Sequence, residues 1–159
     1  MSVRKKKTFT EKLNEERGYP RVQPLEGKAA AKWGGDTILL PSALELDALM
    51  RKVPKGRVTT INQLRETLAD RHGADVCCPI VAGIHARIAA GAAGEEEAAG
   101  KKRVTPYWRT LKAKGELNEK YPGGLDELRR RLEGEGHVVV EKGRKLLVAD
   151  FEEKLARPT

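Results

Sequence analysis

The sequence contains no apolar run that approaches the roughly 20 residues a helix needs to cross a bilayer. Its basic start, residues 4–7, leads into Glu11 and Glu15 instead of the apolar segment and cleavage site that an export signal requires. We therefore expect a protein with no membrane partner that stays in the cytoplasm, associated with the nucleoid where it binds DNA.

Cysteine is scarce, and the two cysteines, Cys77 and Cys78, are neighbours. Neighbours in sequence are badly placed to join distant segments by a disulfide, so we interpret both as thiols. His72 and His85 are the nearest partners for a zinc site, but the spacing lacks the usual Cys-x-x-Cys pattern. We expect no metal and no cofactor.

With 159 residues, 39% of them hydrophobic, the chain can bury one core, and we expect one compact domain with extensions. A formal net charge of +8 favours an anionic partner, because each lysine or arginine near a phosphate can displace a condensed counterion. Charge alone leaves two interpretations open, a nucleic-acid-binding protein and a basic protein whose charge serves only solubility.

The first part of the chain, residues 1–41, is predicted to be a basic and partly ordered N-terminal extension. It is rich in charge and contains three prolines, with one short amphipathic segment over residues 10–17. We expect Trp33 and the apolar residues 38–40 to fasten it to the core.

Helix signals are clearest in the middle of the chain. Ser42 and Glu45 match the capping-box pattern at the start of a helix. Thr60 is a good cap for a second helix over residues 61–71, and a proline opens a third over residues 79–90. A short glycine-containing link joins the second and third helices, which predicts a helix-turn-helix with the third as the recognition helix.

Beyond the third helix, residues 91–102 are small and charged, which favours a flexible loop or a frayed continuation. An amphipathic helix is predicted over residues 125–133, and two apolar runs, 137–140 and 145–148, flank a glycine turn and predict a hairpin. The predicted fold is mainly α with a small β-hairpin, a winged helix-turn-helix that spans residues 42–157.

Several motifs resemble one family. Residues 105–111, Thr-Pro-Tyr-Trp-Arg-Thr-Leu, resemble the active-site segment of the alkylguanine-DNA alkyltransferases, which reads Pro-Cys-His-Arg followed by two aliphatic residues. Residues 121–137, with Gly-Gly-Leu and Glu-Gly-His, are similar to the last helix of that family. Weaker matches lie at residues 55–64 and 81–83. The resemblance covers about residues 42–151 and implies a winged-helix DNA-binding domain.

The reactive residues of the family are replaced. In the family a thiolate accepts the alkyl group, a histidine activates it through water, and a glutamate orients the histidine. Tyr107 falls at the thiol position and Trp108 at the histidine position, while Glu135 matches the glutamate. A phenol, with a pKa of about 10, is a much weaker nucleophile than a thiolate at neutral pH, and an indole has no basic nitrogen. We therefore expect no catalytic residue at this degenerate acceptor site.

The residues that flip a nucleotide are replaced as well. Ile61 stands where the resemblance implies a tyrosine, and the arginine finger falls near Pro79, with Arg87 facing elsewhere on the helix. An apolar wedge such as Ile61 can still open a base step. The chain is most similar to the alkyltransferase-like proteins, which lack the acceptor cysteine, bind the lesion and recruit other repair proteins.

We accordingly predict a monomeric DNA-binding protein without alkyl-transfer activity, which recognises damaged DNA or acts in DNA repair. Its expected partners are duplex DNA, alkylated or not, and repair proteins. Tyr107 and Trp108 either stack on a base or plug the old pocket. The residues that we expect to contact DNA are Arg57, Thr60, Ile61, Pro79, Arg87, Lys101, Lys102, Arg103, Tyr107, Trp108, Arg109 and Arg129.

Two alternatives remain. Cys78 directly precedes Pro79, so a helix N-terminus could lower the pKa of a thiol there and leave Cys78 or Cys77 as a relocated alkyl acceptor. In the other alternative, the protein is an adaptor for protein or RNA that kept the fold but not the DNA function.

Overall fold

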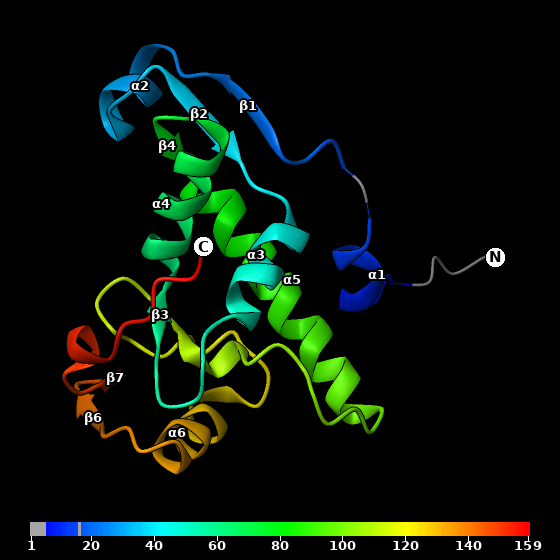
Figure 1. Ribbon diagram of the computed structural model, residues 1–159, viewed down its shortest axis with the longest axis vertical. Coiled ribbons are helices and arrows are strands. Elements are labelled where there is room, and N and C mark those ends of the chain that lie inside the picture. The colour runs from blue at the N-terminus through cyan, green and yellow to red at the C-terminus, as the bar shows by residue number, and fades with distance from the viewer. Residues whose placement is uncertain (1–5, 16) are drawn as a thin grey trace.

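The structure is a computed structural model that describes residues 6–15 and 17–159. As predicted, this part of the chain is mainly helical, but it contains three small sheets where the sequence predicted only a hairpin (Figure 1). Residues 4 and 5 of the basic start lie outside the described residues. None of the described helices is both long and apolar enough to span a membrane. The helices are α1 (Phe9–Leu13), α2 (Gly27–Trp33), α3 (Ala43–Arg51), α4 (Ile61–His72), α5 (Pro79–Ala98) and α6 (Gly124–Gly134).

The strands form three small sheets. The first has the order β1-β2-β4, with β1 antiparallel and β4 parallel to β2. The second joins β3 to β5 in parallel, and the third is the antiparallel hairpin β6–β7. Their bounds are β1 (Arg21–Pro24), β2 (Thr37–Leu40), β3 (Thr59–Thr60), β4 (Val76–Cys77), β5 (Thr110–Leu111), β6 (Val139–Lys142) and β7 (Lys145–Val148).

The helix starts follow the capping rules. The Ser42 hydroxyl accepts a hydrogen bond from the Glu45 amide at 3.1 Å, and the Thr60 hydroxyl accepts one from Gln63 at 3.2 Å. The capping box at α3 is only half formed, because the Glu45 carboxylate instead meets the His72 ring at 2.9 Å. At the other end of α4, Gly73 adopts the left-handed conformation that commonly ends a helix.

The third predicted helix is longer than expected. Helix α5 continues to Ala98, so residues 91–98 are a helical continuation, which was one of the two predicted alternatives, and the flexible-loop alternative is wrong for them. The reason is packing against α1: a Cβ atom on Gly91 would lie 2.4 Å from the Phe9 ring. Glu95 also accepts hydrogen bonds from the Phe9 and Thr10 amides at 2.9 and 2.8 Å. A distant segment therefore stabilises this part of the helix.

The main core surrounds α5, against which α1, α3 and α4 pack (Figure 1). Its largest fully buried side chains include Leu39, Leu46, Leu64 and Leu68. A second, smaller core lies under the β1-β2-β4 sheet, where Ile38, Leu40, Leu25 and Cys78 are buried and Trp33 packs against them. As expected, Trp33 and residues 38–40 fasten the N-terminal segment to the rest of the chain.

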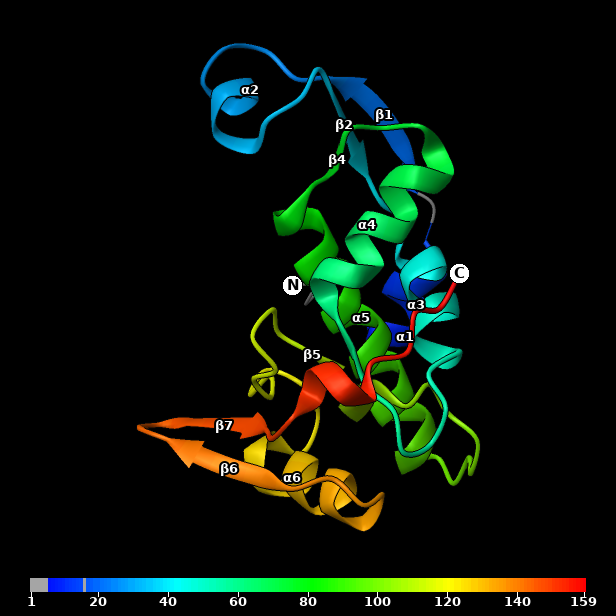
Figure 2. The ribbon, with the colours of Figure 1, turned by 60° about the vertical axis from the view of Figure 1, so that its left-hand side comes forward.

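The C-terminal third follows its local signals. Helix α6 begins and ends one residue outside its predicted range. The hairpin pairs Val139 with Val148 and Lys142 with Lys145, so its first strand begins two residues later than predicted. The hairpin projects from the body of the molecule beside α6 (Figure 2).

Candidate functional site

Tyr107 lies in the core. It opens a short 3-10 turn, η1 (Tyr107–Arg109), and only 2% of its surface is exposed. Its ring makes edge-to-face contacts with Trp108 and Tyr121, with centroid distances of 5.2 and 6.2 Å. Its hydroxyl donates a hydrogen bond to Glu97 at 3.3 Å, and burial raises its pKa to about 12. A base could stack on Tyr107 only if these contacts were broken.

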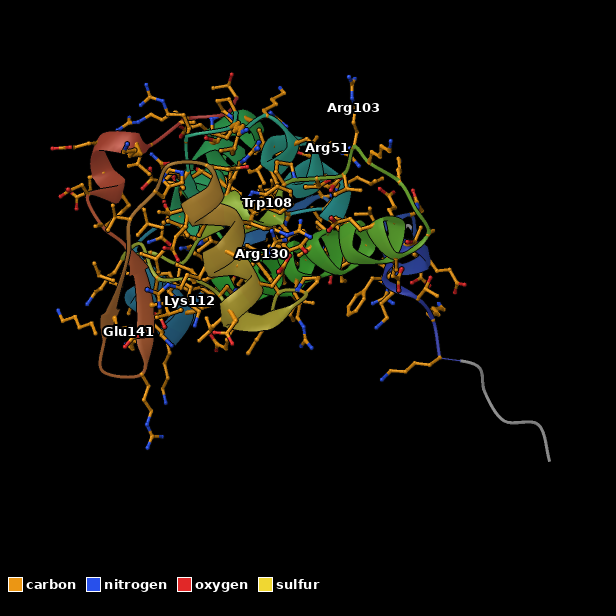
Figure 3. All side chains as sticks on the ribbon, turned by 90° about the horizontal axis from the view of Figure 1, so that it is seen from below. Arg51, Arg103, Trp108, Lys112, Arg130 and Glu141 are labelled. Atoms are coloured by element: carbon orange, nitrogen blue, oxygen red, sulfur yellow. The ribbon has the colours of Figure 1, made fainter. Side chains whose placement is uncertain are left out.

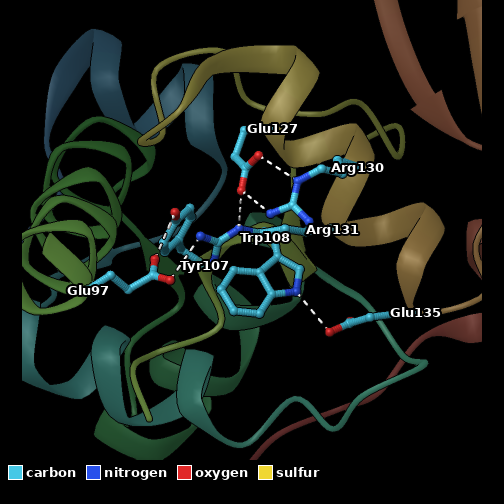
Figure 4. Close-up of polar contacts among 7 residues, drawn as sticks. All are labelled: Glu97, Tyr107, Trp108, Glu127, Arg130, Arg131 and Glu135. Atoms are coloured by element: carbon cyan, nitrogen blue, oxygen red, sulfur yellow. Dashed lines mark hydrogen bonds and ion pairs between the residues drawn. The ribbon is translucent and has the colours of Figure 1, made fainter. Parts of the chain in front are cut away.

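Trp108 is half-buried between two arginines. The Arg131 guanidinium lies 4.5 Å from the indole centroid and that of Arg109 lies 5.5 Å from it, both within cation–π range. The indole N–H donates a hydrogen bond to Glu135 at 3.1 Å (Figure 4). Glu135 therefore orients Trp108. In the family, the resemblance implies, the matching glutamate orients a histidine at the position of Trp108.

Glu135 also forms a two-pronged pair with Arg109. The Arg109 Nε and Nη2 atoms donate to its two oxygens at 2.8 and 2.7 Å, and Nη1 donates to the Val53 carbonyl at 2.8 Å. Both side chains are largely shielded, with 10% of Glu135 and 14% of Arg109 exposed. Burial alone would raise the pKa of Glu135, but the hydrogen bonds from Arg109 and Trp108 outweigh burial and lower it. Arg109 thus braces the local fold.

A second ion-pair group closes the other side of the aromatic pair. Arg131 of α6 donates to Glu97 and to Glu127, each at 2.9 Å, and Arg130 also pairs with Glu127 (Figure 4). Hydrogen bonds from Arg130 and Arg131 lower the pKa of Glu127 to about 2. The polar groups around Tyr107 and Trp108 are therefore engaged with one another, which is the arrangement of a plug and not of an open pocket.

The two thiols are buried, with 2% of Cys77 and 5% of Cys78 exposed. Burial raises the pKa of Cys77 to about 12, opposite to the lowering that a reactive thiol requires. Cys78 does precede α5 as its N-cap residue, but its side chain forms no capping hydrogen bond. His85 binds the Pro41 carbonyl at 2.7 Å, and the described residues contain no cluster of three or more potential metal ligands.

The N-terminal half of α5 has an exposed apolar face. Ile80 is 62% exposed and Ile84 is 54% exposed, and Arg87 follows them at the surface. Beside this face is a surface hollow of about 310 Å³. Its other wall is the segment of residues 112–120, which contributes Lys112 and Lys120. We call Ile80, Ile84 and Arg87 the α5 face.

A smaller hollow of about 120 Å³ adjoins the α5 face. It brings Ile61 and Pro79 together with Tyr121, whose ring makes the edge-to-face contact with Tyr107. Pairing of β3 with β5 holds Leu111, another lining residue, beside the start of α4. The hollow is smaller than the roughly 300–1,000 Å³ of typical ligand pockets.

The other predicted DNA contacts are scattered. Residues 101–103 follow the far end of α5, about 30 Å from Pro79 for a helix of 20 residues. Figure 3 shows Arg103 pointing to a different side of the molecule from Lys112 and Glu141. Arg57 donates to the Glu153 carbonyl at 3.3 Å, and Thr60 is a buried helix cap.

Arg129 is engaged too. It pairs with Glu133 at 2.8 Å and with Glu141 at 3.3 Å.

The structure therefore brings two groups of predicted contacts together. Tyr107, Trp108 and Arg109 meet in the buried turn. Ile61, Pro79 and Arg87 line two hollows beside α5 that share Gly83.

One basic surface was missed at the sequence level. Lys142, Arg144 and Lys145 are exposed at the tip of the β6–β7 hairpin, where no described carboxylate forms an ion pair with them. We call these residues the hairpin tip. Its signal in the sequence is Lys-Gly-Arg-Lys, residues 142–145, in which three cations surround the glycine of the turn.

No protein-family model and no curated protein sequence matches the chain. The fold matches that of S. pombe Atl1 in complex with damaged DNA containing O6-carboxymethylguanine, with a TM-score of 0.50 and 16% identity over 73% of this chain and 94% of that chain. A structure of S. pombe ATL in complex with DNA has a TM-score of 0.46 and 15% identity over the same shares. The chain therefore has the fold of the alkyltransferase-like protein Atl1.

Proposed function

We propose that this protein is an alkyltransferase-like protein that binds duplex DNA and does not transfer alkyl groups. The observation that carries the proposal is the fold shared with Atl1, whose structure contains damaged DNA, over 94% of the Atl1 chain. The identity of 16% makes DNA binding by this chain a proposal, because a fold alone does not determine a function.

In this proposal α4 and α5 form a helix-turn-helix, with α5 as the recognition helix and the β6–β7 hairpin as the wing. The left-handed Gly73 supports this assignment because it lets the chain turn sharply after α4. The exposed Ile80 and Ile84 support it too, because apolar side chains in water gain free energy when a partner covers them. Arg87 at the same face supplies a cation for the phosphate backbone.

In the proposed complex the bases stay stacked in the duplex, or Ile61 opens one base step only partly. The hollow beside Ile61 has about 120 Å³, and the buried Tyr121 that lines it packs on the buried Tyr107. A flipped base would have to displace one of these buried rings. Groove binding needs no such rearrangement, and a role in damage recognition or repair follows from the likeness to Atl1.

The absence of alkyl transfer is proposed on chemical grounds. The acceptor position holds the Tyr107 hydroxyl, which is protonated at neutral pH because burial raises its pKa to about 12. Cys77 and Cys78 are the remaining candidates, and neither is exposed to a substrate.

Two measurements test the proposal. Fluorescence anisotropy with plain and O6-carboxymethylguanine duplexes, over a range of salt concentrations, should give an affinity that falls steeply as salt rises. Failure to bind either duplex at low salt would overturn DNA binding and favour the adaptor alternative. Intact mass after incubation with an alkylguanine oligonucleotide should be unchanged, and one added alkyl group on a cysteine would restore the relocated-acceptor alternative.

A further inference from the structure

The β1-β2-β4 sheet attaches helix α2 firmly beside the start of α5. Strand β2 pairs with β4, and the Cys78 amide donates to the Leu39 carbonyl at 2.8 Å, immediately before α5 begins. The Asp75 carboxylate holds the approach to β2 by accepting hydrogen bonds from the Asp36 and Thr37 amides at 2.8 and 3.2 Å. The position of α2 is therefore fixed relative to the α5 face.

Helix α2 divides into a packed side and a lysine side. Ala29, Ala30 and Trp33 pack on the second core. Lys28 and Lys32 are exposed and lie one turn apart, so they share one face of the helix. Within residues 6–15 and 17–159 neither lysine forms an ion pair with a carboxylate. Like charges at this spacing destabilise a helix slightly, although the Lys32 ammonium lies 5.8 Å from the Trp33 ring centroid, within cation–π range.

The two views of the ribbon agree on where this helix lies. In Figures 1 and 2, α2 and the β6–β7 hairpin occupy opposite ends of the same side of the molecule. The segment of residues 112–120, which borders the α5 face, lies between them. Helix α2 and the hairpin therefore lie at opposite ends of the side that carries residues 112–120, and both elements have exposed lysines.

We propose that Lys28 and Lys32 of α2 contact the phosphate backbone of duplex DNA, on the side of the α5 face opposite to the hairpin tip. The inference rests on the proposed function, since it extends the same interface to a longer stretch of duplex. A duplex presents one negative charge for about every 1.7 Å of its axis, so an elongated basic surface meets phosphates along its whole length. The contact reads charge and shape and carries no sequence information.

The test compares the double variant Lys28→Ala/Lys32→Ala with a matched control, Lys102→Ala/Arg103→Ala. Both remove two exposed positive charges, but the control lies beyond the far end of α5. Each phosphate contact contributes about −0.9 to the slope of log affinity against log salt. On a long duplex the slope of log affinity against log salt should be shallower for the α2 variant than for the wild type by about 1.8. Between 50 and 200 mM salt, the wild type should then lose about 12-fold more affinity than the α2 variant does.

The control variant should keep the wild-type slope, because Lys102 and Arg103, which the sequence predicted as DNA contacts, follow the end of α5 that is remote from the α5 face. On a duplex too short to reach α2, the wild type and the α2 variant should bind alike. A wild-type protein that binds no duplex would defeat the proposed function itself. Binding by the wild type with an unchanged slope for the α2 variant on the long duplex would overturn only the role of α2. Both pairs are exposed, so circular dichroism should show the same fold for all three proteins.

Discussion

The turn that carries Tyr107 and Trp108 and the N-terminal half of α5 have opposite surface chemistry. In the turn, the aromatic rings pack on each other. Glu135 accepts hydrogen bonds from Trp108 and Arg109, and Arg131 pairs with Glu97 and lies over the Trp108 ring. On α5, Ile80 and Ile84 are more than half exposed. The segment that most resembles a family's active site thus supports the fold from inside. The exposed apolar surface that a partner could cover is the α5 face.

The physical reason lies in how buried and exposed groups are stabilised. A buried charge is costly unless it has a partner with good geometry, so the closed network around Trp108 is what a structural element requires. An exposed apolar pair gains nothing from solvent and becomes favourable only when a partner covers it. Four predictions test this contrast, ordered from the largest expected effect to the smallest.

Removal of one buried charge should show how strongly the turn supports the fold. Glu135→Ala leaves Arg109 largely buried without its carboxylate, and breaking a buried pair costs about 3–5 kcal/mol of unfolding free energy. Glu133→Ala is the matched control, because that glutamate pairs with Arg129 at the surface and should contribute less than about 1 kcal/mol. Urea unfolding measures both. Similar small losses for the two variants would mean that the network is not structural.

The opposite outcome is expected for the α5 face. The double variant Ile80→Glu/Ile84→Glu should change the unfolding free energy by less than about 0.5 kcal/mol, because both side chains are already in water. Its affinity for duplex DNA should fall at least tenfold, about 1.4 kcal/mol, through charge repulsion and lost apolar contact. Leu44→Glu, at a 50% exposed position on α3, is the control and should bind normally. Equal DNA affinity of the two variants would show that the interface does not include the α5 face.

The two halves of α5 should have different roles, DNA binding in the N-terminal half and packing against α1 in the C-terminal half. Glu95→Ala, in the C-terminal half, removes the acceptor of the Phe9 and Thr10 amides and should lower the unfolding free energy by about 1 kcal/mol. Hydrogen exchange in α1 should accelerate while DNA affinity stays unchanged. A loss of DNA affinity with unchanged α1 protection would contradict this division of α5.

The smallest effect concerns pH. His137 is 5% exposed, and both of its ring nitrogens lack hydrogen-bond partners. Burial lowers its pKa below the ordinary value of 6.5, so the unfolded chain takes up a proton first as the pH falls. The stability of the wild type should therefore decrease as the pH drops through about 6.5, the pKa of an unperturbed histidine.

His137→Phe should reduce that decrease, with the remainder due to His85, whose pKa burial also lowers. The midpoints of urea unfolding at pH 7.5 and 5.5, for the wild type and the variant, would measure this loss of stability. An identical pH dependence in the variant would show that His137 is protonated equally in both states.

The sequence was most informative where the signals are local. The hydroxyl caps at Ser42 and Thr60 and the hairpin from Val139 onward depend on a few neighbouring residues, and the structure has them close to their predicted places. The extension of α5 through Ala98 could not be predicted in this way. Its stability depends on α1, a segment more than 70 residues earlier in the chain.

The candidate site was predicted in part. The family resemblance placed Trp108 and Glu135 at the positions of a histidine and the glutamate that orients it, and in the structure the indole N–H donates to Glu135 at 3.1 Å. The resemblance could not show that Arg131 and Glu97 would close the pocket, because these residues come from helices whose relative placement is set by the whole core. The prediction of which basic residues lie together was the least successful, because net charge does not show which cations share a face of the molecule.

The most direct test of the account is hydrogen exchange measured by mass spectrometry with and without duplex DNA. Protection on binding is expected in the first two turns of α5, from Pro79 to Arg87, and in residues 112–120, which border the α5 face. The turn Tyr107–Arg109 should exchange slowly in both states, because its partners are internal. DNA-induced protection confined to that turn and to α6, with α5 unchanged, would contradict the central claim that DNA binds the α5 face while the aromatic turn supports the fold.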